Sequence, residues 1–576
     1  MVRQILLAAT VGIAFTVAGC EEASPPAFNP RMFQQAERSD IAQQPTEDLR
    51  PLPTTRETAI PTTRGDEQRA PTTGPDLGEE PVVRLSLREI IHRAVINNHD
   101  VKVSGYQPAI EGTRVIEAQA NFDPAFVAAA QFQDTDQLNG GVFFNNFTTG
   151  ASVLSDVTRS QVGTAQVGMQ QNLESGGQVS LTYENIYNYF TPATTLSNPF
   201  YESNLNLQLT QPLLKNFGSQ VNDAQIVINR LNQKVSLLEF RKTVETTAAN
   251  IEQTYWQLVE TEQDIRIQEQ LIGSTGDTYK ILYSRMRENL DVSDLQVSQA
   301  QADLETRRAL LVQYKAKARD LSDQLKALMS DPEYPVSSAI LILPADEPVT
   351  DPMNFDLQDE LNTAMENRFE LGEQQLKVDS ATVTVGVAKN NLLPELDFIG
   401  SVGPGGVAGN EGDAVTDNFN FQHIDFTAGL KITIPLGNRA ARAVWRRALL
   451  QRMQAIEQYR SEVEQVSVDV KTSARAVKTS WDLIVEDRRA RYDAEATIHS
   501  ILQRERAHEP LTPEFVQLKL DRQQALAAAL QSEANAVSSY NIALAQLERS
   551  KGTLLRYNNV VLQEQNEDAT ESALLH

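Results

Sequence analysis

Several short segments alternate apolar and polar side chains with a period of two. In one of them Leu205, Leu207 and Leu209 share one face of an extended chain and alternate with amides. Such alternation predicts a strand with one apolar face. The six segments with this pattern begin near Phe126, Ala165, Gln178, Asn204, Leu396 and Phe426. We expect residues 133–161 and 188–202 to be long polar loops between them, and 174–177 to be a tight turn.

The polar face of these strands is nearly free of charge, and long and short connections alternate along the chain. Both features are typical of a membrane β-barrel with a water-filled interior, although a half-buried soluble sheet alternates in the same way. Six strands are too few to enclose an open lumen, because about eight is the smallest number seen. If these strands span a membrane, the chain must therefore oligomerise.

A second pattern, with steps of three and four, predicts very long helices. Residues 221–286 carry a narrow apolar stripe on an otherwise polar surface; its members include Val244, Ala248, Ile251, Tyr255, Leu258 and Ile265. About 65 residues at about 1.5 Å each form a rod of roughly 100 Å. A narrow stripe on such a rod indicates a coiled-coil seam. The period breaks at 287–291 and helix resumes to about Met329.

The chain also contains an internal duplication. Residues 85–126 align without a gap with 355–396, at an offset of 270, so that Ala94 matches Ala364 and Pro124 matches Pro394. The second copy also has long helices, 440–506 and onward to about Lys551, with a break at 508–513. Shorter helices, 86–120 and 356–391, precede each group of strands. Two units of over 200 residues are too long for a solenoid repeat.

These patterns divide the chain into segments. The first repeat is 82–330, with strands at 125–213 and a helical hairpin at 219–330. The inter-repeat link is 331–355. The second repeat is 356–552, with strands at 395–436 and a hairpin at 438–551, and a C-terminal tail follows at 553–576.

The N-terminus resembles the signal of a bacterial lipoprotein. Residues 1–19 have Arg3 and an apolar core that ends in Val-Ala-Gly before Cys20, the only cysteine. The resemblance implies cleavage before Cys20 and its acylation, for example by palmitate. Residues 20–81 are rich in Pro, Thr and charge without an apolar period, which predicts a disordered tether. No later stretch is apolar for the roughly 18 residues that a transmembrane helix needs.

Charge and chemistry exclude several classes of function. The net charge of −25 argues against a nucleic-acid partner. The histidines are scattered, and none forms a pair or a Cys/His cluster that would indicate a metal site. Glycines at 403–406 are interpreted as a loop between strands rather than as a phosphate-binding loop. We therefore expect no enzyme. A coiled-coil lipoprotein that only spaces two membranes remains the alternative, although a spacer has no need of alternating strands.

The order helix, strands, helix, break, helix occurs twice, and it resembles the TolC-like outer membrane factors. The match covers about residues 84–555 and depends on the order of its motifs. The residues that carry it include Leu87, Ala94, 97–101, Pro124, 211–218, 255–258 and 435–439. Two departures stand out. Members carry two strands per copy, whereas four are expected here in the first copy. Members also often have Gly at the helical tips, whereas Asn289 and Pro510 lie near those places in this chain.

The resemblance implies a fold and a function. The fold class is α+β: a transmembrane β-barrel shared by a homotrimer, and a long periplasmic coiled-coil tunnel. The chain would be an outer membrane lipoprotein that passively conducts efflux substrates or a secreted polypeptide. Its partners would be a periplasmic adaptor, an inner-membrane pump of RND or ABC type and outer membrane lipid. No cofactor is implied beyond the covalent lipid on Cys20.

Acidic residues near the helical breaks are candidates for the periplasmic mouth. Asp291 and Asp294 lie at the first break, and Glu509 and Glu514 at the second. Three-fold symmetry would turn each of them into a ring of carboxylates, which selects cations. The family similarly has aspartates at this constriction, though near the tip of the second copy. The alternative is that these acids only stabilise helix starts.

Overall fold

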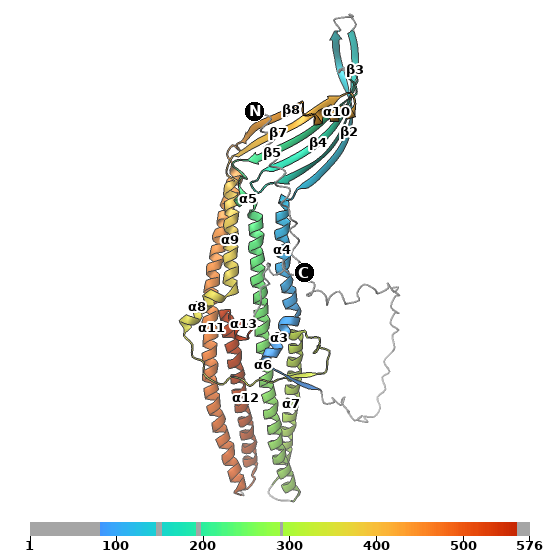
Figure 1. Cartoon of the computed structure of the whole chain (residues 1–576). Coiled ribbons are helices and arrows are strands. Elements are labelled where there is room, and N and C mark those ends of the chain that lie inside the picture. Colours follow the sequence, from blue (N-terminus) through green and yellow to red (C-terminus); the bar gives the residue numbers. More distant parts are fainter. Residues whose placement is uncertain (1–80, 146–151, 192–196, 289–291, 508, 561–576) are drawn as a thin grey trace, which may run out of the picture. The chain divides into compact units, whose positions relative to one another are not determined.

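The computed structural model describes residues 81–145, 152–191, 197–288, 292–507 and 509–560. They lie in one compact unit, Glu79–Val560 (Figure 1). The signal segment, Cys20, the tether, Asp291 and most of the tail lie outside the described residues. Within these ranges no helix is both long enough and apolar enough to cross a membrane.

The internal duplication is visible in the short helices. Helix α3 spans Leu87–Asn97 and α8 spans Leu357–Asn367, so their bounds differ by the offset of 270. Helices α4 (His99–Gln119) and α9 (Phe369–Asn390) begin at the same offset, and α9 is one residue longer. The single helices expected at 86–120 and 356–391 are wrong, because each is interrupted at one extended residue, Asn98 or Arg368.

Asn98 shows the physical reason for this interruption. Its side-chain oxygen accepts a hydrogen bond from the N–H of Val101 at 3.0 Å, which caps the second helix. Its amide nitrogen donates to the carbonyl of Leu328 at 2.7 Å. Arg368 likewise bonds the carbonyl of Arg549, at 3.3 Å. Each break therefore fixes a short helix to the end of a long hairpin.

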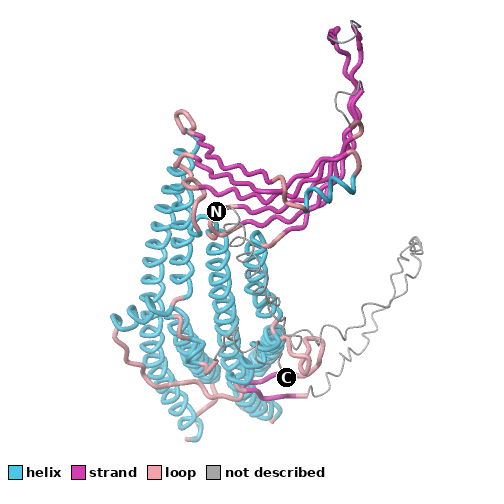
Figure 2. Tube along the Cα trace, turned by 45° about the horizontal axis from the view of Figure 1, so that its top comes forward, coloured by secondary structure: helices cyan, strands magenta, loops and turns pink. Residues whose placement is uncertain are grey.

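Two long hairpins form the rest of the helical part. They consist of α6 (Ala224–Arg287) with α7 (Asp294–Met329), and α11 (Arg439–Arg506) with α12 (Pro513–Lys551). At about 1.5 Å per residue, α6 and α11 are about 100 Å long, as expected. Helices α4, α6, α9 and α11 lie side by side (Figure 2). The apolar stripe of α6 is buried from Val244 to Leu258, whereas Ile265 is half-buried.

The six expected strands form one antiparallel sheet. Its order is β2-β3-β4-β5-β7-β8. The bounds are β2 Ala125–Asn145, β3 Ser152–Asn172, β4 Gln178–Thr191, β5 Phe200–Pro212, β7 Glu395–Ala408 and β8 Ile424–Thr433. The strands lie across the ends of the helices (Figure 2).

Three expectations about the loops are wrong. The segment 133–161 is mostly strand, because β2 and β3 continue as a hairpin beyond the last β3–β4 pair, Arg159 with Thr191 (Figure 1). Part of 188–202 also belongs to β4 and β5. The glycines at 403–406 lie inside β7. A Cβ at Gly403 would come 1.8 Å from the carbonyl oxygen of Leu205, so close approach of the neighbouring backbone explains this glycine.

Smaller elements complete the unit. Strands β1 (Val82–Leu85) and β6 (Leu341–Pro344) pair in parallel, so the link at 331–355 includes a strand. Helix α10 (Glu411–Phe419), which the sequence patterns did not indicate, packs on β5 and β7. The remaining short helices are η2 (Ala120–Phe122), α5 (Ser219–Asn222) and α13 (Leu554–Tyr557).

Candidate functional site

One face of the sheet carries an apolar row that crosses all six strands in register. Its members are Phe126, Met169, Leu181, Leu207, Val402 and Phe426, each paired with the next. Phe126 and Phe426, at the two ends of the row, are 71% and 81% exposed. A continuous exposed apolar surface of this kind marks contact with lipid or with another protein.

The opposite face is mainly polar. The row one residue along consists of Ala125, Gln170, Ser180, Gln208, Ser401 and Thr427, again paired in order. Because successive side chains point to opposite faces of a sheet, the two rows lie on opposite sides. The expected apolar and polar faces are therefore present along these two rows. The polar face is not free of charge, because Glu184, Asp397 and Lys431 lie on the same side of their strands as the polar row.

The sheet ends in two edge strands, β2 and β8. Among the described residues neither pairs with a strand on its outer side. Strand β8 is exposed along its whole length, Ile424–Thr433. Such an edge presents unpaired N–H and C=O groups, which natural proteins cover or pair with another chain.

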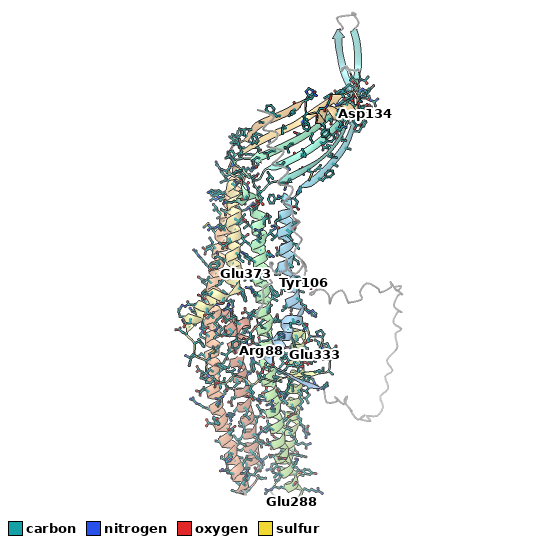
Figure 3. All side chains as sticks on the ribbon, viewed as in Figure 1. Arg88, Tyr106, Asp134, Glu288, Glu333 and Glu373 are labelled. Atoms are coloured by element: carbon teal, nitrogen blue, oxygen red, sulfur yellow. The ribbon has the colours of Figure 1, made fainter. Side chains whose placement is uncertain are left out.

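The two helical breaks meet at the end of the hairpins that is far from the sheet. An apolar cluster joins them; its buried members are Leu282, Val292, Val297, Ala300, Ile501, Leu511, Phe515, Val516 and Leu520. The side-chain amide of Gln296 donates to the carbonyl of Leu511 at 2.9 Å, across the two hairpins. Figure 3 labels Glu288 at this tip and Asp134 near the other end of the unit.

The acids expected at the first break lie in different situations. Asp291 is outside the described residues. Asp294 is the first residue of α7 and is exposed, but Ser293 is the N-cap residue. The N–H of Ser293 donates to Oε1 of Gln296 at 2.7 Å, which belongs to a capping box. Asp294 is thus not the capping residue, although its first-turn position suits the helix dipole.

The two acids at the second break also differ from each other. The guanidinium of Arg504 donates to Glu509, with Nε 2.7 Å from Oε2. This hydrogen bond is the main cause that lowers the pKa of Glu509 below its ordinary value. Glu514 is exposed in the first turn of α12, where Thr512 caps the helix. Among the four candidates, Asp294 and Glu514 are the described, exposed acids that open a helix.

The sequence patterns missed other charged groups at the tip. The Arg504 guanidinium lies over the ring of Phe515, 5.4 Å from its centroid. Lys519 is buried, and its Nζ lies 2.8 Å from both carboxylate oxygens of Glu505. Each of these contacts joins α11 to α12, so they hold the second hairpin together. The sequence signal for the Lys519–Glu505 pair is the presence of opposite charges on the two sides of the break.

A second polar site lies inside the helical part. A cavity of about 310 Å³ is bordered by α6, the start of α9, α11 and α12. Its charged lining residues are Lys242, Glu245, Arg368, Glu370, Asp469 and Arg549. Arg368 reaches Asp469 at 3.3 Å, and Lys242 lies 3.5 Å from Glu370. The charges in this cavity thus largely pair with one another.

Glu245 is the acid in this cavity that has no ion-pair partner among the described residues. It is 4% exposed, and its Oε1 has no hydrogen-bond partner among the described residues. Burial, together with repulsion from Glu370, raises the pKa of Glu245 to about 7. Burial likewise raises the pKa of Glu252, two turns along α6, to about 7. Buried acids on a long helix make its packing sensitive to protons.

The described residues include no group of three or more His, Cys, Asp or Glu side chains that could hold a metal ion. The scattered histidines of the sequence are therefore not assembled into a metal cluster in the part of the chain that is described.

Comparison with known proteins agrees with this geometry. Residues 361–497 match the family described as outer membrane efflux protein. No curated protein sequence matches the chain. Solved structures of outer membrane channels have the same fold as this chain. The resemblance to the TolC-like outer membrane factors is thereby confirmed.

Three solved structures illustrate this similarity. The CmeC outer membrane channel of Campylobacter jejuni has a TM-score of 0.58 at 15% identity, over 84% of this chain and 88% of that one. The outer membrane protein VceC of Vibrio cholerae has a TM-score of 0.57 at 15% identity, over 81% and 96%. The MtrE outer membrane channel of Neisseria gonorrhoeae, in an open state, has 0.56 at 15% identity, over 81% and 89%.

Proposed function

We propose that this protein is the outer membrane channel of a tripartite efflux or type I secretion system. The observation that carries the proposal is the pair of rows on the sheet. The apolar row that includes Phe126 and Phe426 suits lipid, and the polar row that includes Gln170 and Thr427 suits a water-filled lumen.

The edges of the sheet support a trimer. A sheet in lipid must satisfy all its backbone groups, so β2 of one chain would pair with β8 of the next. Three chains with six strands each give an eighteen-stranded barrel. That number lies within the range of barrels with an aqueous channel. In the same trimer, the exposed outer helices α4 and α11 would close a helical tunnel.

The length of the helices supports a periplasmic tunnel. From the sheet, α6 and α11 extend about 100 Å, far beyond the thickness of a bilayer. The hairpin tips would then meet a periplasmic adaptor and an inner-membrane pump of RND or ABC type. The chain itself would be a passive conduit without catalysis, and the pump would supply the energy.

The remaining parts have matching roles in the proposal. Cys20 would carry the lipid anchor, and residues 20–81 would tether it to the channel. Asp294 and Glu514 would form rings of three carboxylates at the mouth, and Asp291 and Glu509 would lie beside them. Rings of acids in a pore favour cations.

The decisive experiment measures assembly and conduction together. Native mass spectrometry in detergent should show three chains, and the same sample should conduct ions in a planar bilayer. Trimers that never conduct would instead favour a structural coiled-coil lipoprotein. A monomer that conducts would contradict the shared barrel.

A further inference from the structure

A cationic cluster lies where the sheet meets the second long helix. Strand β8 and the residues after it expose Ile432, Ile434 and Leu436, the last of them 98% exposed. Helix α11 begins three residues later. Its first turns carry one tryptophan and four exposed arginines: Arg439, Arg442, Trp445, Arg446 and Arg447. An apolar surface therefore changes within a few residues into a cationic one.

A cavity lies within this boundary. It has a volume of about 630 Å³ and is lined by Leu392, Asn438, Arg442, Trp445, Arg446 and Leu449. The Asn438 side chain donates to the carbonyl of Leu392 at 3.1 Å, which joins the segments that precede β7 and α11. The cavity thus combines apolar walls from two leucines and an indole with two guanidinium groups.

Three of the residues that line this cavity, Arg442, Trp445 and Arg446, have side-chain donors without an acceptor among the described residues. Nε1 of Trp445 is shielded from solvent and has no hydrogen-bond partner among the described residues. Arg442 and Arg446 show no ion pair or hydrogen bond to any other described side chain, in contrast to Arg452 two turns further on, which bonds Thr382 at 2.9 Å. Unpaired donors of this kind indicate a site for an anionic acceptor.

The first repeat supplies an internal comparison. Its long helix α6 also follows a strand, after a connection that includes the short helix α5, but it has Asp223 as the N-cap residue and its first arginine at Arg230. No tryptophan occurs there before Trp256. The same architecture therefore forms without a cationic cluster, so the fold alone does not explain the cluster on α11.

We propose that this cavity binds the phosphate of a phospholipid headgroup in the membrane leaflet that faces the helices. The proposal rests on the proposed function, because it requires the sheet to lie in the membrane. Arg442 and Arg446 would contact the phosphate oxygens, since guanidinium groups match that geometry. Trp445 would donate its N–H at the headgroup level, where indoles are favoured. The acyl chains would lie along Ile432 and Ile434.

A free phosphate ion offers the same acceptor oxygens. We favour lipid because Leu392, Leu449 and the exposed Leu436 border the arginines, and a free ion gains nothing from apolar walls. Cations next to a membrane surface attract anionic lipids in particular. Phosphatidylglycerol should therefore bind more tightly than phosphatidylcholine.

The test uses the full-length protein in detergent and two matched double variants. Arg442→Gln with Arg446→Gln removes the cavity arginines, whereas Arg439→Gln with Arg447→Gln removes the same charge from the same turns outside the lining. Lipid binding is measured by native mass spectrometry with added phosphatidylglycerol, phosphatidylcholine or inorganic phosphate. We expect the first variant to weaken phosphatidylglycerol binding about tenfold or more, as for lost charge-assisted hydrogen bonds. The second should keep most of it.

Trp445→Phe provides a separate measurement, because it keeps an aromatic ring and loses only the N–H donor. It should weaken phosphatidylglycerol binding several-fold without loss of trimer. Equal binding by both double variants would overturn the proposal. So would saturation by inorganic phosphate alone, or loss of trimers in the Arg442 and Arg446 variant, which would make the cavity a subunit contact. A parent protein that conducts but shows no lipid preference would refute this inference and leave the proposed function intact.

Discussion

The hydroxyl of Tyr255 lies 2.9 Å from Oδ2 of Asp346, which is 91 residues further along the chain. The hydroxyl oxygen of Tyr255 also accepts hydrogen bonds from the N–H groups of Ala345 and Asp346, at 3.1 and 3.0 Å. Tyr540 on α12 holds the link in the same way, because its hydroxyl bonds Asp351 and Met353. The two tyrosines, both fully buried, therefore attach the inter-repeat link to both hairpins.

Tyr255→Phe should lower the stability of the helical part. The variant leaves the N–H groups of Ala345 and Asp346 without their acceptor, which costs about 1–3 kcal/mol when such groups are buried. Thermal unfolding followed by circular dichroism measures the effect. Tyr492→Phe is the matched control, because Tyr492 is 55% exposed. Equal melting temperatures for the two variants would show that the link contributes little.

Stability should depend on pH through Glu245. Its pKa is about 7 in the folded chain and about 4.5 when exposed, so the folded state binds more protons between these values. Stability should therefore fall as pH rises from 4.5 to 7. Glu245→Gln should raise stability at pH 8, by on the order of 1–3 kcal/mol, and have little effect at pH 4.5.

The control for this pH effect is Glu239→Gln, an exposed acid on the same helix. Unfolding curves of both variants and the parent are recorded at pH 4.5, 6 and 8. If Glu239→Gln stabilises the protein at pH 8 as much as Glu245→Gln does, net charge rather than burial is the cause.

The two faces of β8 should respond differently to a charge. Phe426→Lys places an ammonium group on the apolar row, where a barrel in lipid loses about 2–4 kcal/mol near the midplane. Thr427→Lys places it on the polar row, where the cost should be small. Membrane fractionation measures insertion, and electrophoresis of heated and unheated samples measures assembly of the trimer. Equal assembly of the two variants would argue against a lipid-facing row.

Asp294→Asn combined with Glu514→Gln should reduce cation selectivity in bilayer recordings. Removing two rings of three carboxylates lowers the negative potential at the mouth. Reversal potentials in a salt gradient measure the change, and the exposed Glu366→Gln on α8 is the control. Unchanged selectivity with a lower melting temperature would mean that the two acids serve only the helix dipole, an effect of about 0.3–1 kcal/mol each.

Cys20→Ser should abolish labelling by a fatty-acid analogue in cells. The barrel should still insert, because the strands carry their own apolar surface and the tether is long. Labelling and membrane fractionation are measured on the same cultures. Labelling of the variant at the level of the parent would contradict the lipoprotein assignment.

The sequence predicted the elements with a strong period and missed those without one. The stripe from Val244 to Leu258 and the alternation around Leu207 repeat often enough to identify a helix and a strand. Gly403 was assigned to a loop because the sequence cannot show that the backbone of Leu205, on a neighbouring strand, leaves no room for a side chain there. Polar residues 133–137 also lack an apolar face, so their strand pairing could not be foreseen.

The site was predicted less completely than the fold, because it depends on contacts across breaks. Glu509 pairs with Arg504 because the turn between them brings the two side chains together. The unpartnered Oε1 of Glu245 depends on four helices meeting around it. Neither feature produces a periodic pattern of apolar and polar residues, so neither could be predicted from the sequence.

The uneven distribution of strands, four in the first repeat and two in the second, has a geometric consequence. Because strands enter as pairs, both long hairpins still leave the sheet on the same side. In the proposed trimer, an added hairpin would widen the barrel, whose diameter grows roughly linearly with strand number, and leave the number of tunnel helices unchanged. The width of the opening to the outside could thus change while the helical tunnel keeps its diameter.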